Sequence, residues 1–228
     1  MDAIDMGVEF VKSRGMYFPK APFLTGRPRK ALRLGTYDHQ KAEAALRVIR
    51  SDDRVLELGA GIGFLSTLLA TKRQVQSIHC YDANPKLVRY IREVHVANGV
   101  VQAQVHNAVL SAEAGDPVPF YERDHFLDSS LDASDEPPLA EHQVTRATLA
   151  EAMETARPTA LISDLSGAEA KVLIGTDLTA LRLAIIELDT AALGQTGVQT
   201  IFDTMADAGL TYFPRASDKK VVTFLKGW

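Results

Sequence analysis

Three closely spaced glycines are the part of the sequence whose chemistry is easiest to interpret. Gly59, Gly61 and Gly63 follow an apolar run that predicts a β-strand. Glycine has no side chain, so this spacing lets the backbone turn sharply and approach a bound ligand closely. Phe64 stands where a dinucleotide-binding loop needs its last glycine, so the pyrophosphate pattern G-x-G-x-x-G is not met. We expect Ala60 and Phe64 to complete a loop that binds a different cofactor.

Two carboxylates indicate which cofactor this is. Glu57 lies at the start of the turn, where it would repel a pyrophosphate but attract the cationic amino group of S-adenosylmethionine. Asp82 follows Gly63 by nineteen residues, the spacing at which a carboxylate accepts the ribose hydroxyl protons. The alternative for Asp82 is a surface residue that caps the helix beginning at Pro85. The other residues expected around the adenosine are Ala83, Asn84, Asn107 and Ala108.

Three further acidic residues are candidates for the reaction itself. Asp164 follows a predicted strand at 159–163, so it is placed to orient an acceptor or to take its proton, or else to cap the next helix. Glu169 is either a site residue or a charge that stabilises the first turn of that helix. Glu187 ends another apolar strand and is either a site carboxylate or half of a salt bridge. A divalent metal bound by these carboxylates is an alternative that no ligand spacing in the sequence supports.

The order of the predicted elements positions these residues. From residue 38 onward, helical periodicity alternates with short apolar runs, which predicts an α/β fold with a parallel sheet and helices on both faces. We expect two final strands, at 210–213 and 220–225, to form a C-terminal hairpin with an antiparallel strand. This arrangement, with helices on both faces of a mostly parallel seven-stranded sheet, is the one expected of a Rossmann-like class I methyltransferase fold. The other expected strands are 54–58, 77–81, 101–109, 159–163 and 183–188, and the expected helices are 42–49, 64–70, 85–97, 149–155, 168–174 and 198–208.

The chain divides into an extension and one domain. We expect residues 1–36 to form an N-terminal extension that packs on the core, and residues 37–228 to form a single domain. An insertion at about 111–147 is acidic and lacks a sustained helical period. We interpret it as a lid-like loop that faces the substrate, with partial disorder as the alternative. His125 and His142 lie in this loop and are either solvated or bases.

Composition limits the compartment and the partners. Cys80 is the only cysteine among 228 residues, so neither a disulfide framework nor a cysteine-based zinc site is expected. The N-terminus does not resemble a signal peptide, and no stretch is long and apolar enough for a membrane span, so we expect a cytoplasmic protein without a membrane partner. The net charge of −4 gives no nucleic-acid signature. A homo-oligomer is left open. One basic cluster is either a phosphate contact or a solvated surface: Arg27, Arg29, Lys30 and Arg33.

Several segments together resemble the FkbM family of methyltransferases. They are residues 35–38, 57–66, 82–85, 163–169, 172–175 and 185–187. The resemblance covers roughly residues 35–190, and its most specific part is the block from Asp164 to Glu169 with the V-L-x-G that follows. It implies S-adenosylmethionine as methyl donor and a hydroxyl acceptor on a sugar, polyketide or other secondary metabolite. Ser166 stands where the family usually has Glu, and Asp38 where it has Glu.

We therefore expect a methyltransferase that acts on the hydroxyl group of a small molecule, with Asp164 as base or orienting residue. Tyr37 and Asp38 are expected to close over the methionine end of the cofactor, unless Asp38 caps a helix. One alternative is methylation of an amine or a protein side chain, although the Asn/Asp-Pro-Pro-aromatic motif of many such enzymes is absent after Asp164. Another is a non-catalytic regulatory subunit that binds the cofactor, which Ser166 suggests. A nicotinamide-dependent oxidoreductase is disfavoured by Phe64.

Overall fold

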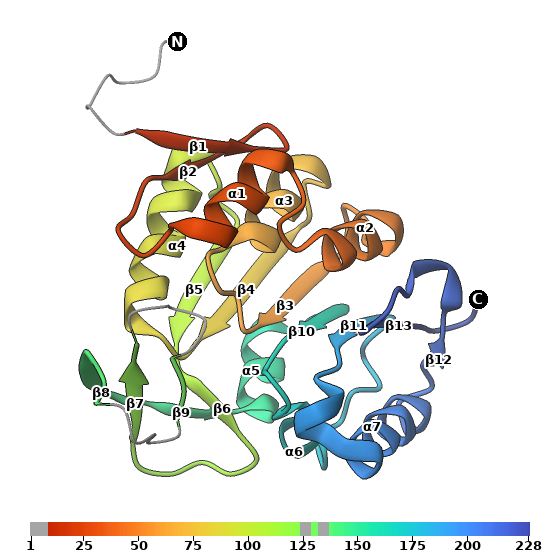
Figure 1. Cartoon of the computed structure of the whole chain (residues 1–228). Helices are drawn as coiled ribbons and strands as arrows, with labels where there is room; N and C mark the ends of the chain where they lie inside the picture. Colours follow the sequence, from red (N-terminus) through yellow and green to blue (C-terminus); the bar gives the residue numbers. More distant parts are fainter. Residues whose placement is uncertain (1–8, 124–128, 132–136) are drawn as a thin grey trace.

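A seven-stranded sheet forms the centre of the molecule in the computed structural model, which describes residues 9–123, 129–131 and 137–228 (Figure 1). The strand order is β12-β13-β11-β10-β3-β4-β5. The neighbours from β5 to β11 run parallel, while β13 is antiparallel to both β11 and β12. This confirms the predicted fold class. The strands are β3 (Arg54–Leu58), β4 (Ser77–Asp82), β5 (Ala103–Asn107), β10 (Ala160–Ser163), β11 (Leu183–Glu187), β12 (Thr211–Tyr212) and β13 (Val221–Leu225).

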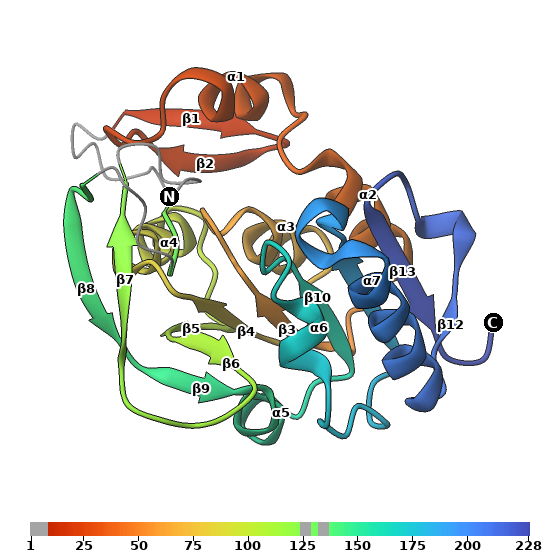
Figure 2. The same ribbon diagram turned by 60° about the horizontal axis from the view of Figure 1, so that its bottom comes forward.

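Helices cover the two faces of this sheet because successive strand residues point in opposite directions. Figure 2 shows helices on both sides of the sheet. Val55 and Ile185 belong to the buried core beneath the first group of helices, whereas Leu56 and Ile186 belong to the core beneath the second group. None of the helices in the described ranges is both long and apolar enough to span a membrane. The first group is α2 (His39–Val48), α3 (Phe64–Lys72) and α4 (Pro85–Ala97), and the second is α5 (Leu149–Ala156), α6 (Glu169–Leu173) and α7 (Thr190–Asp207). Helix α1 (Gly26–Leu34) belongs to the N-terminal extension.

Helix α7 begins earlier than the sequence pattern predicts. The side chain of Asp189 accepts hydrogen bonds from the backbone N–H groups of Ala191 and Ala192 at 3.1 and 3.2 Å, and these bonds start the helix at Thr190. Gly194 interrupts the helix with φ 61° and ψ −180°. The turns before Gly194 therefore do not continue the helical periodicity from which we predicted the helix at residues 198–208.

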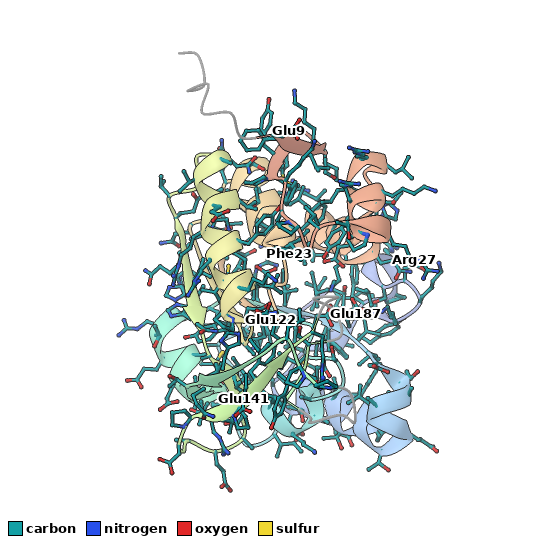
Figure 3. The ribbon with its side chains drawn as sticks, turned by 60° about the vertical axis from the view of Figure 1, so that its left-hand side comes forward. Glu9, Phe23, Arg27, Glu122, Glu141 and Glu187 are labelled. Carbon is teal, nitrogen blue, oxygen red and sulfur yellow. The ribbon has the colours of Figure 1, made fainter. Side chains whose placement is uncertain are left out.

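The described part of the N-terminal extension packs on the first group of helices. It consists of an antiparallel pair, β1 (Phe10–Ser13) and β2 (Met16–Pro19), followed by α1. The Phe18 side chain is fully buried, and its ring stacks on that of Phe64 with 5.9 Å between the centroids. Arg27 projects from α1 into solvent (Figure 3). The side chains of the basic cluster make no hydrogen bond or ion pair within the described part of the chain. The cluster is Arg27, Arg29, Lys30 and Arg33.

The insertion has more regular structure than the loop we expected. Two antiparallel strands, β7 (Val118–Glu122) and β8 (Ala140–Val144), form an insertion hairpin. At its base, β6 (Val109–Ser111) pairs in parallel with β9 (Arg146–Thr148). His125 lies outside the described residues. The alternation Val118, Phe120, Glu122 is strand-like, but it is too short to stand out among polar residues.

Candidate cofactor and acceptor site

The glycine turn lies between β3 and α3, and its three glycines have different structural tasks. All have positive φ, at 77°, 57° and 73° for Gly59, Gly61 and Gly63. A Cβ on Gly59 would lie 1.9 Å from the backbone oxygen of Asp164, and one on Gly63 would lie 2.9 Å from Cγ2 of Ile91. A Cβ on Gly61 would meet nothing within 4 Å. The outer glycines thus permit close packing, while the middle one faces open space that suits a ligand.

Asp82 connects the end of β4 to this turn. Its Oδ2 accepts a hydrogen bond from the Gly61 N–H at 2.8 Å, and its Oδ1 accepts one from the Asn84 N–H at 2.8 Å. Burial raises the pKa of Asp82 to about 6, although both backbone bonds act to lower it. Helix α4 is capped instead by Asn84, whose Oδ1 accepts from the N–H of Lys86 at 3.0 Å. Asp82 is therefore free of the capping role and remains mainly ionised at neutral pH.

The residues predicted around the adenosine shape the turn that follows β4. The Asn107 Nδ2 group donates to the backbone oxygens of Asp82 and Ala83, both at 3.0 Å. The Ala108 N–H donates to the same Asp82 oxygen at 3.2 Å. These bonds hold Ala83 and Asn84 beside the turn, so the structure does bring the predicted group together. The Asn107 amide supports the backbone here.

Glu57 lies beneath the turn with a side chain that is buried from solvent. Its residue is 3% exposed, and its Oε2 accepts a 3.4 Å hydrogen bond from the Cys80 thiol. Burial raises the pKa of Glu57 to about 8, so the neutral acid predominates at pH 7. The attraction for a cationic amino group that we expected from the sequence therefore requires this acid to lose its proton when the cation approaches.

Lys41 is a site residue that the sequence pattern did not reveal. Its ammonium lies 3.1 Å from Oδ1 of Asp38 and 2.8 Å from Oε2 of Glu187, and it also pairs with Oδ2 of Asp164. Burial acts to lower the pKa of Lys41, but the three carboxylates outweigh it and raise the pKa above its ordinary value. One signal in the sequence pointed to Lys41: it lies three residues after Asp38, at the start of a helix face that is otherwise apolar.

Glu187 joins this carboxylate cluster to a second cation. Its Oε1 pairs with the ammonium of Lys220, so both readings of Glu187, site carboxylate and salt-bridge partner, describe its position. Burial acts to raise the pKa of Glu187, but Lys41 and Lys220 hold it below its ordinary value. The described residues contain no group of His, Cys, Asp and Glu arranged to hold a metal ion. The Lys41 ammonium occupies the centre where a cation bound by these carboxylates would lie.

Glu169 lies apart from this cluster and is fully buried. Its Oε1 accepts from the Leu165 N–H at 2.5 Å and its Oε2 from the Gly167 N–H at 2.9 Å. Burial raises the pKa of Glu169. These bonds stabilise the loop after β10, in which Ser166 adopts φ 51°. Glu169 therefore shapes the segment that carries Asp164, with both of its oxygens committed to the backbone.

Tyr37 and Asp38 enter the site from the chain before α2. The Tyr37 ring packs edge-on against Phe64, with 5.3 Å between the centroids. Burial raises the pKa of the Tyr37 hydroxyl. Asp38 adopts a left-handed conformation with φ 52° and makes no side-chain cap to α2, because its carboxylate pairs with Lys41. Tyr37 thus lies beside Phe64, which directly follows the glycine turn. Closure of Tyr37 and Asp38 over the methionine end of the cofactor stays a prediction.

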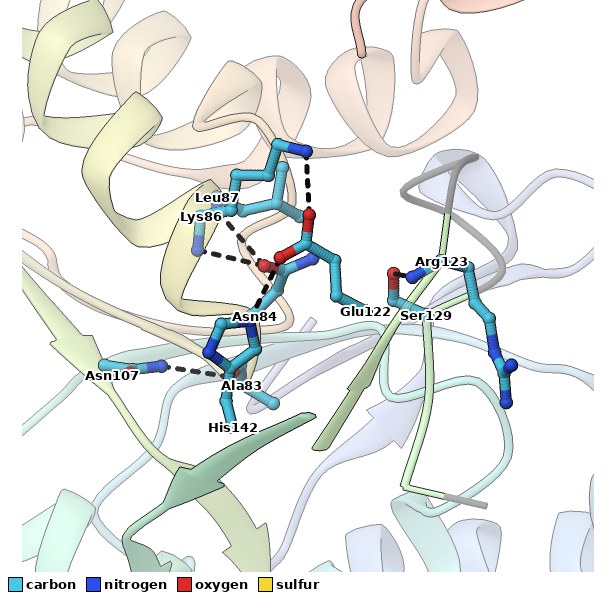
Figure 4. A network of polar contacts seen from close by, with 9 residues as sticks. All are labelled: Ala83, Asn84, Lys86, Leu87, Asn107, Glu122, Arg123, Ser129 and His142. Atoms are coloured by element: carbon cyan, nitrogen blue, oxygen red, sulfur yellow. Dashed lines mark hydrogen bonds and ion pairs between the residues drawn. The ribbon is translucent and has the colours of Figure 1, made fainter. Parts of the chain in front are cut away.

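The insertion hairpin contacts the turn that follows β4 and the start of α4 (Figure 4). Glu122 lies 2.8 Å from the Lys86 ammonium in the first turn of α4, and 3.0 Å from Nε2 of His142 across the hairpin. Burial acts to raise the pKa of Glu122, but Lys86 and His142 hold it below its ordinary value. Phe120 pairs directly with His142 and packs in a small apolar cluster with Ala83. The hairpin is thereby fixed beside the predicted adenosine pocket.

Comparison with known proteins agrees with this geometry. Residues 42–118 match the family model of the methyltransferase small domain, which is about a third of the chain. This segment is similar to a methyltransferase domain. It contains the glycine turn, Glu57 and Asp82, so the match supports the predicted methyltransferase and S-adenosylmethionine as its cofactor. No curated protein matches the sequence.

Solved structures share the fold at low sequence identity. A methyltransferase from Pyrococcus furiosus aligns with a TM-score of 0.52 and 12% identity, over 94% of this chain and 91% of that chain. Trm5b from Pyrococcus abyssi aligns with a TM-score of 0.51 and 11% identity, over 98% of this chain and 56% of that chain. These likenesses show the Rossmann-like fold of class I methyltransferases. Membership of the FkbM family and the hydroxyl acceptor stay predictions.

Proposed function

We propose that the protein is an S-adenosylmethionine-dependent O-methyltransferase that acts on a hydroxyl group of a sugar, polyketide or other small metabolite. The observation that carries the cofactor assignment is the link between Asp82 and the glycine turn. The Asp82 carboxylate is fixed by the Gly61 and Asn84 N–H groups, and Gly61 borders open space. A fixed carboxylate beside an open glycine suits a ribose, since its oxygens have lone pairs left for two hydroxyl groups.

The charge of the neighbouring cluster suits the rest of this cofactor. S-adenosylmethionine supplies an electrophilic methyl group on a cationic sulfur. Asp38, Asp164 and Glu187 face Lys41 and Lys220, so three acids and two bases leave one formal negative charge. This excess of negative charge at the carboxyl ends of β10 and β11 favours a cationic ligand.

Asp164 is the residue that we assign to the acceptor. Its side chain is 31% exposed, and Lys41 holds its Oδ2. Among the described residues, Oδ1 accepts no hydrogen bond. A carboxylate anchored at one oxygen and open at the other can orient a hydroxyl group through a hydrogen bond and accept its proton. Lys41 holds Asp164 in position, and Glu187 in turn pairs with Lys41.

Calorimetry with S-adenosylmethionine tests the cofactor assignment. We expect binding to the native protein and a loss of about 10-fold or more in affinity for Asp82→Ala, because hydrogen bonds to a charged group contribute roughly 1.5–3 kcal/mol. Asp52→Ala is the matched control, because Asp52 is exposed and precedes β3 at the opposite end of the strand. Absence of binding, or equal affinity in both variants, would refute the assignment.

Methyl transfer from isotopically labelled cofactor tests the acceptor assignment. The protein is offered panels of hydroxyl and amine compounds, and the products are analysed for the methylated atom. We expect methylated oxygen, and loss of product without loss of cofactor binding in Asp164→Asn. Methylated nitrogen would instead support the amine alternative. Cofactor binding without transfer to any acceptor would support the regulatory alternative.

A further inference from the structure

A surface hollow of about 530 Å³ lies at the opposite end of the sheet from the glycine turn. Its apolar part includes Ile49, Phe213 and Leu225. Ligand pockets of small molecules are typically about 300–1,000 Å³, so a small ligand fits this volume. The remaining lining is dominated by cations: Arg47, Arg50, Lys72, Arg73 and Arg182.

Two of these cations already have partners. Arg182 donates from Nε to Oδ1 of Asp53 at 2.8 Å and from Nη2 to the backbone oxygen of Val48 at 2.8 Å. Arg47 donates to the backbone oxygen of Arg215. These bonds fix the walls of the hollow, and Asp53 is the acid that compensates one of the five positive charges.

The other three cations have no such compensation. The side chains of Arg50, Lys72 and Arg73 are exposed, and none makes a hydrogen bond or ion pair within the described part of the chain. Arg50 follows the C-cap of α2, Lys72 is the last residue of α3, and Arg73 is the C-cap of α3. These three cations give the rim a positive charge, although the net charge of the whole protein is −4. The positive rim favours an anionic ligand.

The hollow is separate from the proposed methyl-transfer site. Arg50 precedes β3 and Arg182 precedes β11, so the hollow lies at the amino ends of the parallel strands. The glycine turn and Glu187 follow the carboxyl ends of the same strands. The five residues of β3 alone span about 16 Å at roughly 3.3 Å per residue. A ligand in the hollow therefore does not overlap the cofactor.

We propose that this hollow binds a small organic phosphate. Guanidinium groups and ammonium groups bind phosphate oxygens by charge-assisted hydrogen bonds, and Arg50, Lys72 and Arg73 supply such donors on the rim. Phe213 and Leu225 offer an apolar surface for the organic part of the ligand. The combination fits a phosphorylated compound with a ring better than it fits inorganic phosphate alone.

The single tryptophan of the chain lies next to a residue that lines the hollow. Trp228 packs edge-on against Phe213, with 4.9 Å between the ring centroids. Pyrophosphate does not absorb where tryptophan does, so titration of the native protein with pyrophosphate can be followed by tryptophan fluorescence. GDP and guanosine are then titrated by calorimetry with saturating S-adenosylhomocysteine present, which keeps nucleosides out of the cofactor site.

We expect GDP to bind at least about 10-fold more tightly than guanosine, because charge-assisted bonds to the phosphates dominate. The double variant Arg50→Ala, Arg73→Ala should weaken GDP and pyrophosphate binding by about 10-fold or more, with S-adenosylhomocysteine binding unchanged. Lys30→Ala is the matched control, since Lys30 is an exposed cation on α1 outside the hollow. Thermal unfolding of each variant verifies its folding.

Four outcomes would overturn the proposal. The first is that GDP does not bind, and the second is that guanosine binds as tightly as GDP. The third is equal GDP binding by the double variant and the Lys30 control. Binding of a single-stranded RNA oligonucleotide in place of GDP, lost in the double variant, would also overturn it and assign the rim to a macromolecule. Failure of methyl transfer leaves this test intact, because its readout is binding alone.

Discussion

Among the described residues, Lys41 is the only cation that Asp38, Asp164 and Glu187 share, and replacement by Met removes it. The Lys41 side chain is 6% exposed, so its charge and those of Asp38, Asp164 and Glu187 are held in a poorly solvated place. Removing one partner from a buried ion pair costs about 3–5 kcal/mol, because the remaining charge is left uncompensated. We expect Lys41→Met to lose this much free energy of unfolding.

Thermal and urea unfolding at neutral pH measure this loss. For a chain of 228 residues, 1 kcal/mol corresponds to about 2–4 °C in Tm, so a decrease of roughly 6–20 °C is expected. Lys220→Met is the matched control. Lys220 pairs with Glu187 alone and its side chain is 57% exposed, so its loss should cost no more than about 1 kcal/mol.

The pH dependence of the variant gives a second check on the same cluster. Without Lys41, the pKa of Asp38, which burial already raises, rises further, and Glu187 loses one of the two cations that lower its pKa. Stability is then retained at low pH and lost as the pH rises through the raised values. The difference from the native protein should therefore shrink toward pH 4, roughly the ordinary carboxyl pKa. A loss no larger than that of Lys220→Met, or one independent of pH, would refute the shared-cation interpretation.

The structure supports three other predictions. Gly59→Ala should abolish cofactor binding and cost about 2 kcal/mol or more in unfolding free energy, because its Cβ would lie 1.9 Å from a backbone oxygen and φ is positive. Gly61→Ala, with open space around its Cβ, should cost only about 1 kcal/mol of unfolding free energy, and equal losses for the two variants in urea unfolding would contradict this difference. Cofactor affinity should fall as the pH drops through the Asp82 pKa of about 6, because the ionised form binds ribose. Calorimetry across pH should find this fall absent in Asp82→Asn, whereas a separate dependence near the Glu57 pKa of about 8 should remain in both proteins. Lys86→Met should free the insertion hairpin from α4 and speed amide hydrogen exchange in β7 and β8 about 5-fold, whereas unchanged exchange would show that the ion pair with Glu122 does not hold the hairpin.

Local sequence signals were sufficient to predict the central sheet and the glycine turn. The strand predicted at residues 54–58 has the bounds of β3, because an apolar run ends there at a glycine. Helix α4 begins at Pro85 as predicted, since proline is favoured in a first turn. Asp164 and Glu187 were each predicted at the end of a strand of the parallel sheet, and Lys41 contacts both in the structure.

The same local signals could not reveal contacts between residues that lie far apart in the sequence. Lys41 and Asp164 are separated by 123 positions, and an isolated lysine in a helix resembles any solvated surface residue. The insertion hairpin was missed because its strands have only five residues each and much of the sequence between them is polar. Burial also changed the chemistry of Glu57, whose charge we had taken for granted from its residue type.

The position of β13 constrains the order in which the protein folds. β12 precedes β13 along the chain but lies outside it in the sheet, so β12 joins the sheet only through β13. Until residues 221–225 emerge from the ribosome, the edge of β11 stays unpaired during synthesis. An apolar strand with an open edge is prone to pair with other chains. The nascent protein therefore has a period of vulnerability to aggregation that ends only when β13 inserts.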